Sequence, residues 1–515
     1  MTTDKKYDAI VVGGGHNGLV AATYLAKSGK SVLLLEGAAE LGGATTSVRP
    51  FPEYDARLSR YSYLVSLLPD QIVADLGINF KTLERSIASY TPYAKGGKDA
   101  GLLISQNWDE RTAVNFQELT GSAVEGAAWQ KFYNEIADLA VRIAPSMLQP
   151  LKTSAELKSE IGLDNTWNYL MERPIGEVIQ ERFSDDIVRG VVLTDALIGT
   201  FVSAQDLQAN RCFLYHLIGN GSGQWRVPQG GMGALVIELN RVATSHGVEI
   251  KLNSRVTGIE SDQIGVAVTT SSGQKYVAKD LLFAGAPQTL AKLRGLPAPE
   301  SLEGSQMKIN MLLSRLPKLK SGIDPKLAFA GTFHINESYS QLDNAYKTAN
   351  EGGIPSDLPL EMYCHTLTDP TILSPELSQK GFHTLTLFGL HTPAALFDND
   401  PEGAKNAAKK AAIESLNQYL EEPIESVLAV CNDGSLAIEA KSPLDLETDL
   451  GLPRGNIFHR DLDFPFIDGT EPTELKWGSE TSDKHIFLAG AGARRGGGVS
   501  GIAGHNAAMA ALAND

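Results

Sequence analysis

Residues 7–36 read YDAIVVGGGHNGLVAATYLAKSGKSVLLLE, and this stretch decides the fold class. The run at 7–12 is short and apolar, as in a strand buried on both faces of a parallel sheet. The glycine turn GGGHNG at 13–18 follows, and residues 19–29 continue with helical spacing to a glycine stop. A second apolar run at 31–36 ends in an acid. This βαβ unit predicts an α/β fold with a Rossmann-like domain.

The turn at 13–18 has the GxGxxG spacing of a dinucleotide-binding site. Gly13 permits the tight turn, Gly15 lets the backbone approach a pyrophosphate, and Gly18 brings helix and strand together. Glu36 lies where a carboxylate would accept the two ribose hydroxyls of an adenosine, and it would repel a 2′-phosphate. The alternative is a structural turn between strand and helix.

A second glycine turn, at Gly42, Gly43 and Ala44, follows the acid closely. Here again the backbone can pass beside a pyrophosphate, although a plain loop is the alternative. From these turns outward, the chain resembles the phytoene dehydrogenase-related flavoproteins, within the wider amine-oxidase and glutathione-reductase-like FAD clan. The sub-group around pyridine nucleotide-disulphide oxidoreductase domain-containing protein 2 is the most similar. The resemblance extends over residues 7–47, 59–68, 228–232, 280–287 and 486–508, and hardly touches 81–220 and 310–450.

The resemblance implies a bound FAD and a set of residues that contact it. The flavin would be non-covalent, since no cysteine lies near the last glycine segment and His505 falls inside a helical pattern. The implied contacts are Gly13, Gly15, Gly18, Gly42, Gly43 and Ala44 to the pyrophosphate, Glu36 to the adenosine ribose, Val256 to adenine, and Gly490, Val499 and Ser500 to the ribityl chain and flavin.

Two positions depart from the family pattern in the last glycine segment. Ala491 stands where the clan often has an Asp, and Arg494-Arg495 stands where desaturase-like members commonly have His-Pro. We hypothesise that Arg495 faces the substrate side of the flavin as a catalytic residue and could hold an acidic group. The alternative is that both arginines pair with some of the 61 acidic residues.

The C-terminal glycines also support a mechanistic interpretation that does not depend on the family resemblance. Residues 496–498 let the backbone pack flat against a ring, and a helix beginning near Gly501 would point its amide end at the same place. The alternative is a glycine-rich joint between packed helices. Residues 496–501 also match GxGxxG, but no strand and acid complete a second unit, so we expect no separate NAD(P)H domain.

The rest of the chain predicts a discontinuous two-domain arrangement. The FAD-binding domain would comprise 1–80, 225–300 and 455–515, and a mixed α+β substrate domain would comprise 81–224 and 301–454. The first substrate stretch has helical patterns. The second has alternating runs that predict a sheet with one buried face.

Composition excludes several classes of function. The 515 residues carry a formal charge of −16, which disfavours nucleic acid and anionic membranes as partners. The three cysteines form no CxxC, the histidines show no metal-ligand spacing, and no metal site is expected. No secretory signal is apparent, and the longest apolar stretch, 187–204, is interrupted by charges, so no transmembrane segment and a cytoplasmic location are expected.

These observations predict an FAD-dependent oxidoreductase that performs a two-electron oxidation. The resemblance suggests desaturation or related isomerisation of a small, largely apolar substrate, with an acidic end as one option. Amine-oxidase-like C–N oxidation, or a flavin-containing binding or assembly protein with little turnover, are the alternatives. The electron acceptor, oxygen or a quinone, and the oligomeric state stay open.

Overall fold

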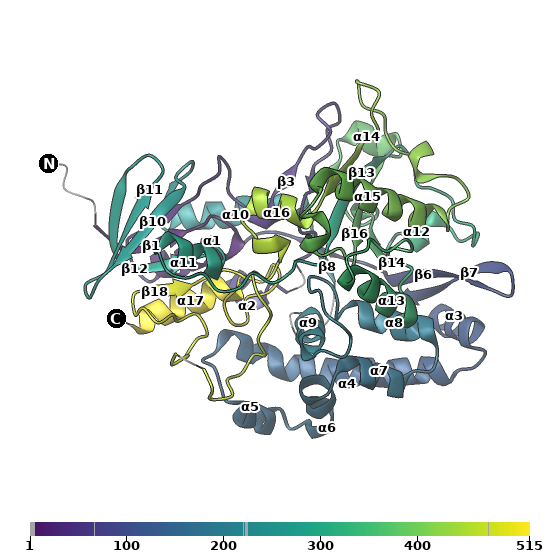
Figure 1. Ribbon diagram of the computed structural model, residues 1–515, viewed down its shortest axis with the longest axis horizontal. Coiled ribbons are helices and arrows are strands. Elements are labelled where there is room, and N and C mark those ends of the chain that lie inside the picture. The colour runs from purple at the N-terminus through teal and green to yellow at the C-terminus, as the bar shows by residue number, and fades with distance from the viewer. Residues whose placement is uncertain (1–5, 66, 220, 222–224, 472, 515) are drawn as a thin grey trace.

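Two seven-stranded sheets and a layer of helices make up the molecule (Figure 1). The computed structural model describes residues 6–65, 67–219, 221, 225–471 and 473–514. The first sheet lies at the end of the molecule that holds both chain termini, and the second lies at the opposite end. The predicted α/β fold class is confirmed.

The first sheet contains the predicted βαβ unit. Its strand β1 is parallel to β2 on one side and to β12 on the other. The strand order is β10-β11-β12-β1-β2-β9, with β18 beside β12. The bounds are β1 Lys6–Val12, β2 Val32–Leu35, β9 Glu249–Lys251, β10 Val256–Ser261, β11 Val266–Thr270, β12 Lys275–Phe283 and β18 Ile486–Leu488.

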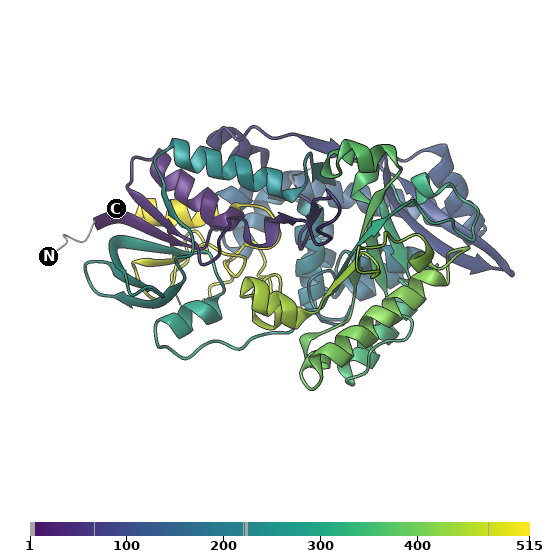
Figure 2. The ribbon, with the colours of Figure 1, turned by 90° about the horizontal axis from the view of Figure 1, so that it is seen from above.

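Three helices cover one face of this sheet: α1 (His16–Lys27), α10 (Met232–Ser245) and α17 (Ile502–Ala513). Figure 2 shows them side by side, although they come from the beginning, the middle and the end of the chain. Alternate residues of β1, such as Ala9 and Val11, contact these helices. On the other face, residues of β1 and β2 such as Ile10 and Leu33 form one cluster with side chains from β10, β11 and α11 (Pro287–Leu293). Burial on both faces explains why these strands are almost continuously apolar.

The second sheet is mainly antiparallel, in the order β17-β13-β16-β15-β14-β6-β7. One of its faces packs against α12 (Pro325–Ala328) and α15 (Pro401–Asn417) in a wholly apolar core. The strand bounds are β6 Ile87–Lys95, β7 Lys98–Ser105, β13 Met307–Leu313, β14 Thr332–Ile335, β15 Leu360–Tyr363, β16 His383–Gly389 and β17 Ile438–Lys441.

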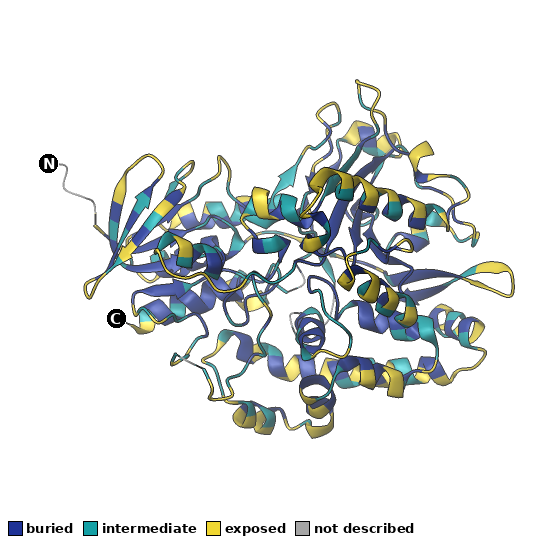
Figure 3. Ribbon diagram, viewed as in Figure 1, coloured by how far each residue is buried: buried dark blue, intermediate teal, exposed yellow. Residues whose placement is uncertain are grey.

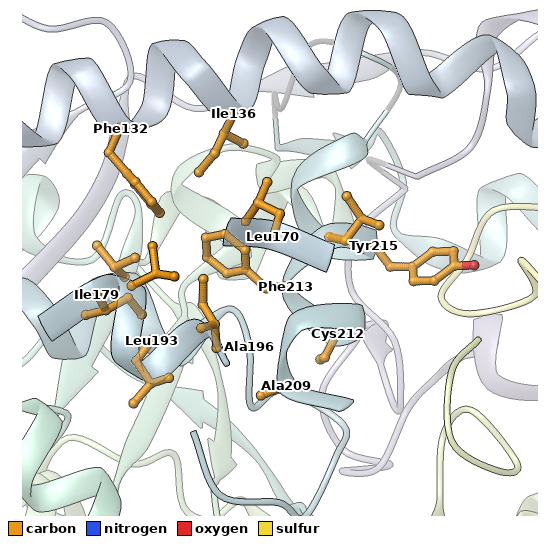
Figure 4. Close-up of a cluster of buried hydrophobic side chains, with 14 of the residues drawn as sticks. Phe132, Ile136, Leu170, Ile179, Leu193, Ala196, Ala209, Cys212, Phe213 and Tyr215 are labelled. Atoms are coloured by element: carbon orange, nitrogen blue, oxygen red, sulfur yellow. The ribbon is translucent and has the colours of Figure 1, made fainter. Parts of the chain in front are cut away.

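The helical layer lies against the other face of the second sheet. It is held by its own core, in which Phe132, Phe213 and Leu193 meet (Figure 4). The helices are α3 Glu110–Thr120, α4 Val124–Ile143, α5 Ser154–Ile161, α6 Asp164–Trp167, α7 Ile175–Arg182, α8 Asp186–Thr194 and α9 Leu207–Ile218. Shorter elements complete the fold: α2 Asp70–Leu76, α13 Tyr339–Asn350, α14 Pro375–Gln379, α16 Pro443–Leu450, and the strand pairs β3 Ser47–Val48 with β4 Leu58–Ser59 and β5 Thr82–Glu84 with β8 Arg226–Pro228.

The prediction that the second sheet has one buried face was wrong. On β15, Leu360 and Met362 point into the apolar core, and Glu361 and Tyr363 on the opposite face are just as buried. Figure 3 shows the strands of this sheet largely in dark blue. The helical layer covers the polar face, so the alternation of residue types marks two different buried environments. We call this face the polar face of the second sheet.

The strands of the two sheets come from different parts of the chain, and these parts correspond to the two predicted domains. Every strand of the first sheet lies within 1–80, 225–300 or 455–515, and every strand of the second lies within 81–224 or 301–454. The boundaries themselves stay a prediction.

The packing of α1 against α17 generates a stability prediction. A β-carbon at Gly504 would lie 2.0 Å from the carbonyl oxygen of Asn17, so Gly504→Ala must push the helices apart. Overpacking costs about 1–3 kcal/mol, and alanine's helix propensity returns at most about 1 kcal/mol. We expect the thermal unfolding midpoint to fall by about 1–3 °C, because a chain of this length has an unfolding entropy of roughly 1 kcal/mol per kelvin. Gly258→Ala, whose β-carbon has its nearest neighbour at 3.9 Å, is the control, and equal midpoints in the two variants would contradict the prediction.

Candidate cofactor and substrate site

The turn after β1 needs glycine at both ends. Gly13 has a positive φ of 104°, which side chains rarely adopt. A β-carbon on Gly18 would lie 2.0 Å from the carbonyl oxygen of Gly13. These two glycines therefore let α1 begin directly above the end of β1.

The backbone at Gly15, between these two glycines, and at Gly43 in the second glycine turn has free space on one side. A β-carbon on Gly15 would meet nothing nearer than the carbonyl oxygen of Gly42, at 3.8 Å, and one on Gly43 would meet only the Cα of Gly15, at 3.6 Å. The N–H of Gly42 donates to the carbonyl of Gly14 at 2.9 Å, which holds the two glycine turns side by side. No side chain caps α1 at Gly15, and its first turn contains no acid. Backbone donors, an open surface and a helix N-terminus fit a pyrophosphate.

Glu36 lies at the end of β2 next to this cradle. Its carboxylate accepts hydrogen bonds from the backbone N–H of Gly14 at 2.6 Å and of Ala38 at 2.7 Å. The carbonyl of Glu36 accepts from the N–H of Ser254 at 2.7 Å, so the chain leading into Val256 passes the same strand end. The structure thus brings Glu36 and Val256 together, as an adenosine site requires, and their contacts with adenosine stay predictions.

The last glycine segment reaches the same region from the C-terminus. Gly490 lies so close to the carbonyl of Ala284 that a β-carbon would approach it to 2.6 Å. After Val499, the hydroxyl of Ser500 accepts from the N–H of Ile502 at 3.2 Å, and α17 begins there without a side-chain cap on Gly501. The predicted helix start near Gly501 is confirmed. The N-termini of α1 and α17 therefore converge.

A buried histidine lies at this convergence. The Nε2 atom of His16, the first residue of α1, is buried and has no hydrogen-bond partner among the described residues. Burial lowers the pKa of His16 to about 4, so the ring is neutral near pH 7. An orphaned polar atom beside two uncapped helix ends fits a region that receives a polar cofactor.

Arg494 and Arg495 have different partners. Arg494 pairs with Glu471 at 3.1 Å, as the alternative reading expected. The Arg495 side chain is 1% exposed, and its guanidinium donates to the carbonyls of Ser146, Gln149 and Trp477 at 2.7–2.8 Å. These contacts account for its charge without a substrate, and the catalytic role of Arg495 stays an untested prediction.

A cavity of about 290 Å³ separates the helical layer from the polar face of the second sheet. The helical wall is aromatic and aliphatic, with Trp129, Tyr133 and Ile136 of α4 and Val191 of α8. The wall on the side of the sheet is polar and contains Arg85, Ser89, Thr332, His334 and Glu361, and Asp195 closes the end of α8.

The ionisable groups of this cavity form one electrostatic cluster. On adjacent strands, His334 lies opposite Glu361, and its Nδ1 is 2.5 Å from Oε2 of Glu337. Burial lowers the pKa of His334 to about 4 and raises that of Asp195 to about 6. Burial also raises the pKa of Glu361 and of Glu337 well above the usual range. A neutral pair in which the carboxyl of Glu337 donates to Nδ1 fits these directions.

Aromatic rings and a second cation continue the polar face beyond the cavity. The Tyr363 ring lies 4.1 Å from that of Tyr63, measured between centroids, and the Arg85 guanidinium lies 4.8 Å from its centre. Farther along, Lys308 is 2% exposed and donates to the carbonyls of Ser59 at 3.0 Å and Tyr61 at 2.6 Å.

Sequence reasoning missed the ionisable residues of this wall. They come from separate elements and form no local motif. The available signal was the alternation at residues 360–365, where Glu361, Tyr363 and His365 occupy every second position.

Two negative findings complete the description. Among the residues that the structure describes, no three histidine, cysteine or acidic side chains are grouped so that they could hold a metal ion. Within the same residues, no helix is long and apolar enough to cross a membrane.

The position of Glu36 generates a prediction on cofactor affinity. Replacing it with Ala removes charge-assisted hydrogen bonds to the ribose worth roughly 1.5–3 kcal/mol, so FAD should bind the apoprotein about 10- to 100-fold more weakly. The measurement is a fluorescence titration of apoprotein with FAD. Glu40→Gln, an exposed acid in the following loop, is the control, and an unchanged affinity of Glu36→Ala would place the ribose elsewhere.

The contacts of Arg495 generate a second prediction, which separates its two roles. If its function is to tie three carbonyls together, Arg495→Gln lowers the thermal midpoint and leaves the flavin potential of the folded fraction unchanged. The measurement is a reductive titration of the purified, FAD-loaded variant. A lowered flavin potential with wild-type stability would instead support the substrate-facing role.

Comparisons with known proteins agree with this geometry. The model of the family described as flavin containing amine oxidoreductase matches residues 18–312. An uncharacterised protein of Mycobacterium tuberculosis is 43% identical over 99% of this chain and 98% of its own length. Pyridine nucleotide-disulfide oxidoreductase domain-containing protein 2 of Mus musculus is 29% identical over 98% of this chain and 93% of its own, which confirms the predicted resemblance.

The fold has a close counterpart among solved structures. A structure of putrescine oxidase covers 99% of both chains with a TM-score of 0.58 and 18% sequence identity, which supports the fold and says nothing of the substrate. The cofactor cradle, the family match and the full-length relatives agree, and the chain belongs to the flavin-containing amine oxidoreductase family.

Proposed function

We propose that the protein holds FAD non-covalently and oxidises a small, largely apolar substrate by two electrons, in a desaturation or a related isomerisation. The observation that carries the proposal is the 290 Å³ cavity, which has an apolar helical wall and a polar wall on the side of the sheet. When bound, FAD supplies the redox chemistry by accepting two electrons from the substrate. The protein's own residues bind, orient and shield the reactants.

The two converging helices supply the binding electrostatics. The N-terminus of α1, which no side chain caps, favours the negative charge of a pyrophosphate, and the N-terminus of α17 would likewise favour negative charge on the bound flavin. Neither first turn contains an acid that would cancel this effect.

A continuous chain of contacts connects the cradle to the second sheet. The N–H of Ser62 donates to the carbonyl of Ala44 at 3.1 Å, and the neighbouring carbonyls of Ser59 and Tyr61 accept from Lys308. Burial lowers the pKa of Lys308 well below its usual range, which is typical of a site from which water is excluded. These contacts support a flavin ring at the boundary between the first sheet and the polar face.

His365 is a further buried residue near the polar face, and it does not line the cavity. It is buried, and neither ring nitrogen has a partner among the described residues. Burial, together with the charges of Arg85 and Lys308, lowers its pKa well below 6.5. The ring is therefore neutral and can accept a hydrogen bond, but its lowered pKa makes it a poor acceptor of a proton.

C–N oxidation is the second candidate, and membership of the flavin-containing amine oxidoreductase family favours it. The two reactions differ in their products, because amine oxidation releases the nitrogen and desaturation retains it. A flavoprotein with little turnover is the remaining alternative, with oxygen or a quinone as acceptor for either enzyme.

The proposal predicts a yellow protein with one FAD per chain. We expect long-chain alkenes, polyenes or alkylamines to bleach the flavin anaerobically in stopped-flow mixing. NADH and NADPH should not do so quickly, because the chain has one complete dinucleotide-binding βαβ unit. A colourless protein that fails to bind FAD, or FMN as the extracted flavin, would contradict the cofactor assignment. Fast bleaching by a nicotinamide cofactor would indicate a reductase.

A further inference from the structure

Two histidines lie where the first glycine segment, 13–18, meets the last, 490–498. His16 is the first residue of α1, and the backbone of Gly498 forms a hydrogen bond with its ring. His459 lies beside the last segment, since a β-carbon on Gly492 would be 3.3 Å from the Cβ atom of His459. Both segments also pack against Ala284. The two histidines therefore belong to one region of the molecule.

Each of these rings keeps a nitrogen without a partner. The Nε2 atom of His16 and the Nδ1 atom of His459 are buried, and neither has a hydrogen-bond partner among the described residues. His459 also has a positive φ of 66°, which is uncommon for a residue with a side chain. Unpartnered buried nitrogens and a strained backbone in one place are typical of a site that receives a ligand.

Both rings are neutral near pH 7. Burial lowers the pKa of His459 to about 4, and a charge on the nearby His16 would lower it further. The pKa of His16 is lowered to about 4 by its own burial. A neutral imidazole has one nitrogen that donates and one that accepts, so it matches a hydroxyl group, whereas a phosphate would favour a charged ring.

The last glycine segment has no free polar side chain to offer such a ligand. Residues 490–498 read GAGARRGGG, so Arg494 and Arg495 are the polar side chains of this segment. The guanidinium of Arg494 pairs with Glu471, and that of Arg495 donates to backbone carbonyls. A polar ligand that crosses this segment therefore depends on other elements for hydrogen bonds from side chains.

The order of the groups in FAD indicates which part would cross here. Adenosine is followed by the pyrophosphate, then by the ribityl chain with its hydroxyl groups, and finally by the flavin ring. Glu36 and the open backbone at Gly15 fit the first two groups, and the N-terminus of α17 fits the ring. His16 directly follows Gly15 and contacts Gly498, so it lies between these positions.

We propose that His16 and His459 hold the ribityl chain of FAD, by hydrogen bonds between their unpartnered ring nitrogens and its hydroxyl groups. The inference rests on the cofactor assignment of the proposed function. It adds two positioning residues that the glycine motifs do not specify. Because the flavin ring is attached to the ribityl chain, holding the chain also orients the ring.

The test compares FAD with ADP on the full-length apoprotein by isothermal titration calorimetry. ADP shares the adenosine and the pyrophosphate with FAD but has no ribityl chain. His16→Ala and His459→Asn each remove one ring, and asparagine is among the residues that tolerate a positive φ. Each variant should bind FAD about 2- to 10-fold more weakly, as expected for one lost hydrogen bond, and should bind ADP as the wild type does.

His391→Asn is the matched control. His391 is also a buried histidine, with a positive φ of 54°, and neither of its ring nitrogens has a partner among the described residues. It follows β16 of the second sheet, where its ring packs against Phe201 and Tyr346. We expect this variant to bind FAD with wild-type affinity.

An FAD analogue with a plain pentyl chain in place of the ribityl chain tests the wild-type protein directly, in case a variant fails to fold. The wild type should bind this analogue more weakly than FAD. His16→Ala should cause no further loss of affinity for it, because the hydroxyl partner is already absent.

The inference is supported if both variants weaken FAD binding while ADP binding and the His391→Asn control are unchanged. An equal loss of ADP affinity would overturn it, because the histidines would then only support the glycine cradle. Equal binding of FAD and the pentyl analogue by the wild type would also overturn it. A wild-type apoprotein that binds no FAD would refute the proposed function as well, whereas full FAD affinity in both variants would overturn this inference alone.

Discussion

The contact between Gly504 and the carbonyl of Asn17 is the constraint on which the cofactor site depends. It fixes the first turn of α17 against the first turn of α1 at a distance that no side chain permits, so the N-termini of the two helices lie side by side. The same helices form the core over the first sheet, which ties the position of the last glycine segment to the packing of the domain. The electrostatics of the site are therefore a consequence of hydrophobic packing around one glycine.

The second sheet buries polar groups beside the cavity, and this burial lowers the stability of the fold. A sheet covered on both faces would be most stable with apolar residues throughout. Here one face buries Lys308, Glu361 and Tyr363, and Glu361 and Tyr363 each keep a polar atom without a partner among the described residues. Such atoms are rare in protein interiors, so they distinguish this face from ordinary core.

The sequence predicted the first sheet well because its signals are local. Gly13 to Gly18, the apolar run of β2 and the acid at its end are adjacent, and each has a physical requirement that narrows the choice of residue. The substrate cavity could not be predicted in this way. Asp195 follows a helix, His334 and Glu361 lie on two strands, and Arg85 lies in a loop, so only tertiary structure brings them together. For Arg495, a local signal pointed to a contact that the structure does not show. Its position beside the glycines suggested a substrate contact, whereas its hydrogen-bond partners are backbone carbonyls.

The order of the strands in the first sheet determines when this protein can become functional during synthesis. β1 and β2 leave the ribosome early, yet their sheet requires β12 from the middle of the chain and β18 and α17 from the last thirty residues. Until those residues emerge, the face of β1 that holds Ala9 and Val11 lacks one of its three covering helices. A nascent chain therefore exposes an aggregation-prone surface for most of its translation, which makes a holding chaperone useful. Cofactor binding at this site therefore depends on residues 486–513 as much as on the βαβ unit at 6–36.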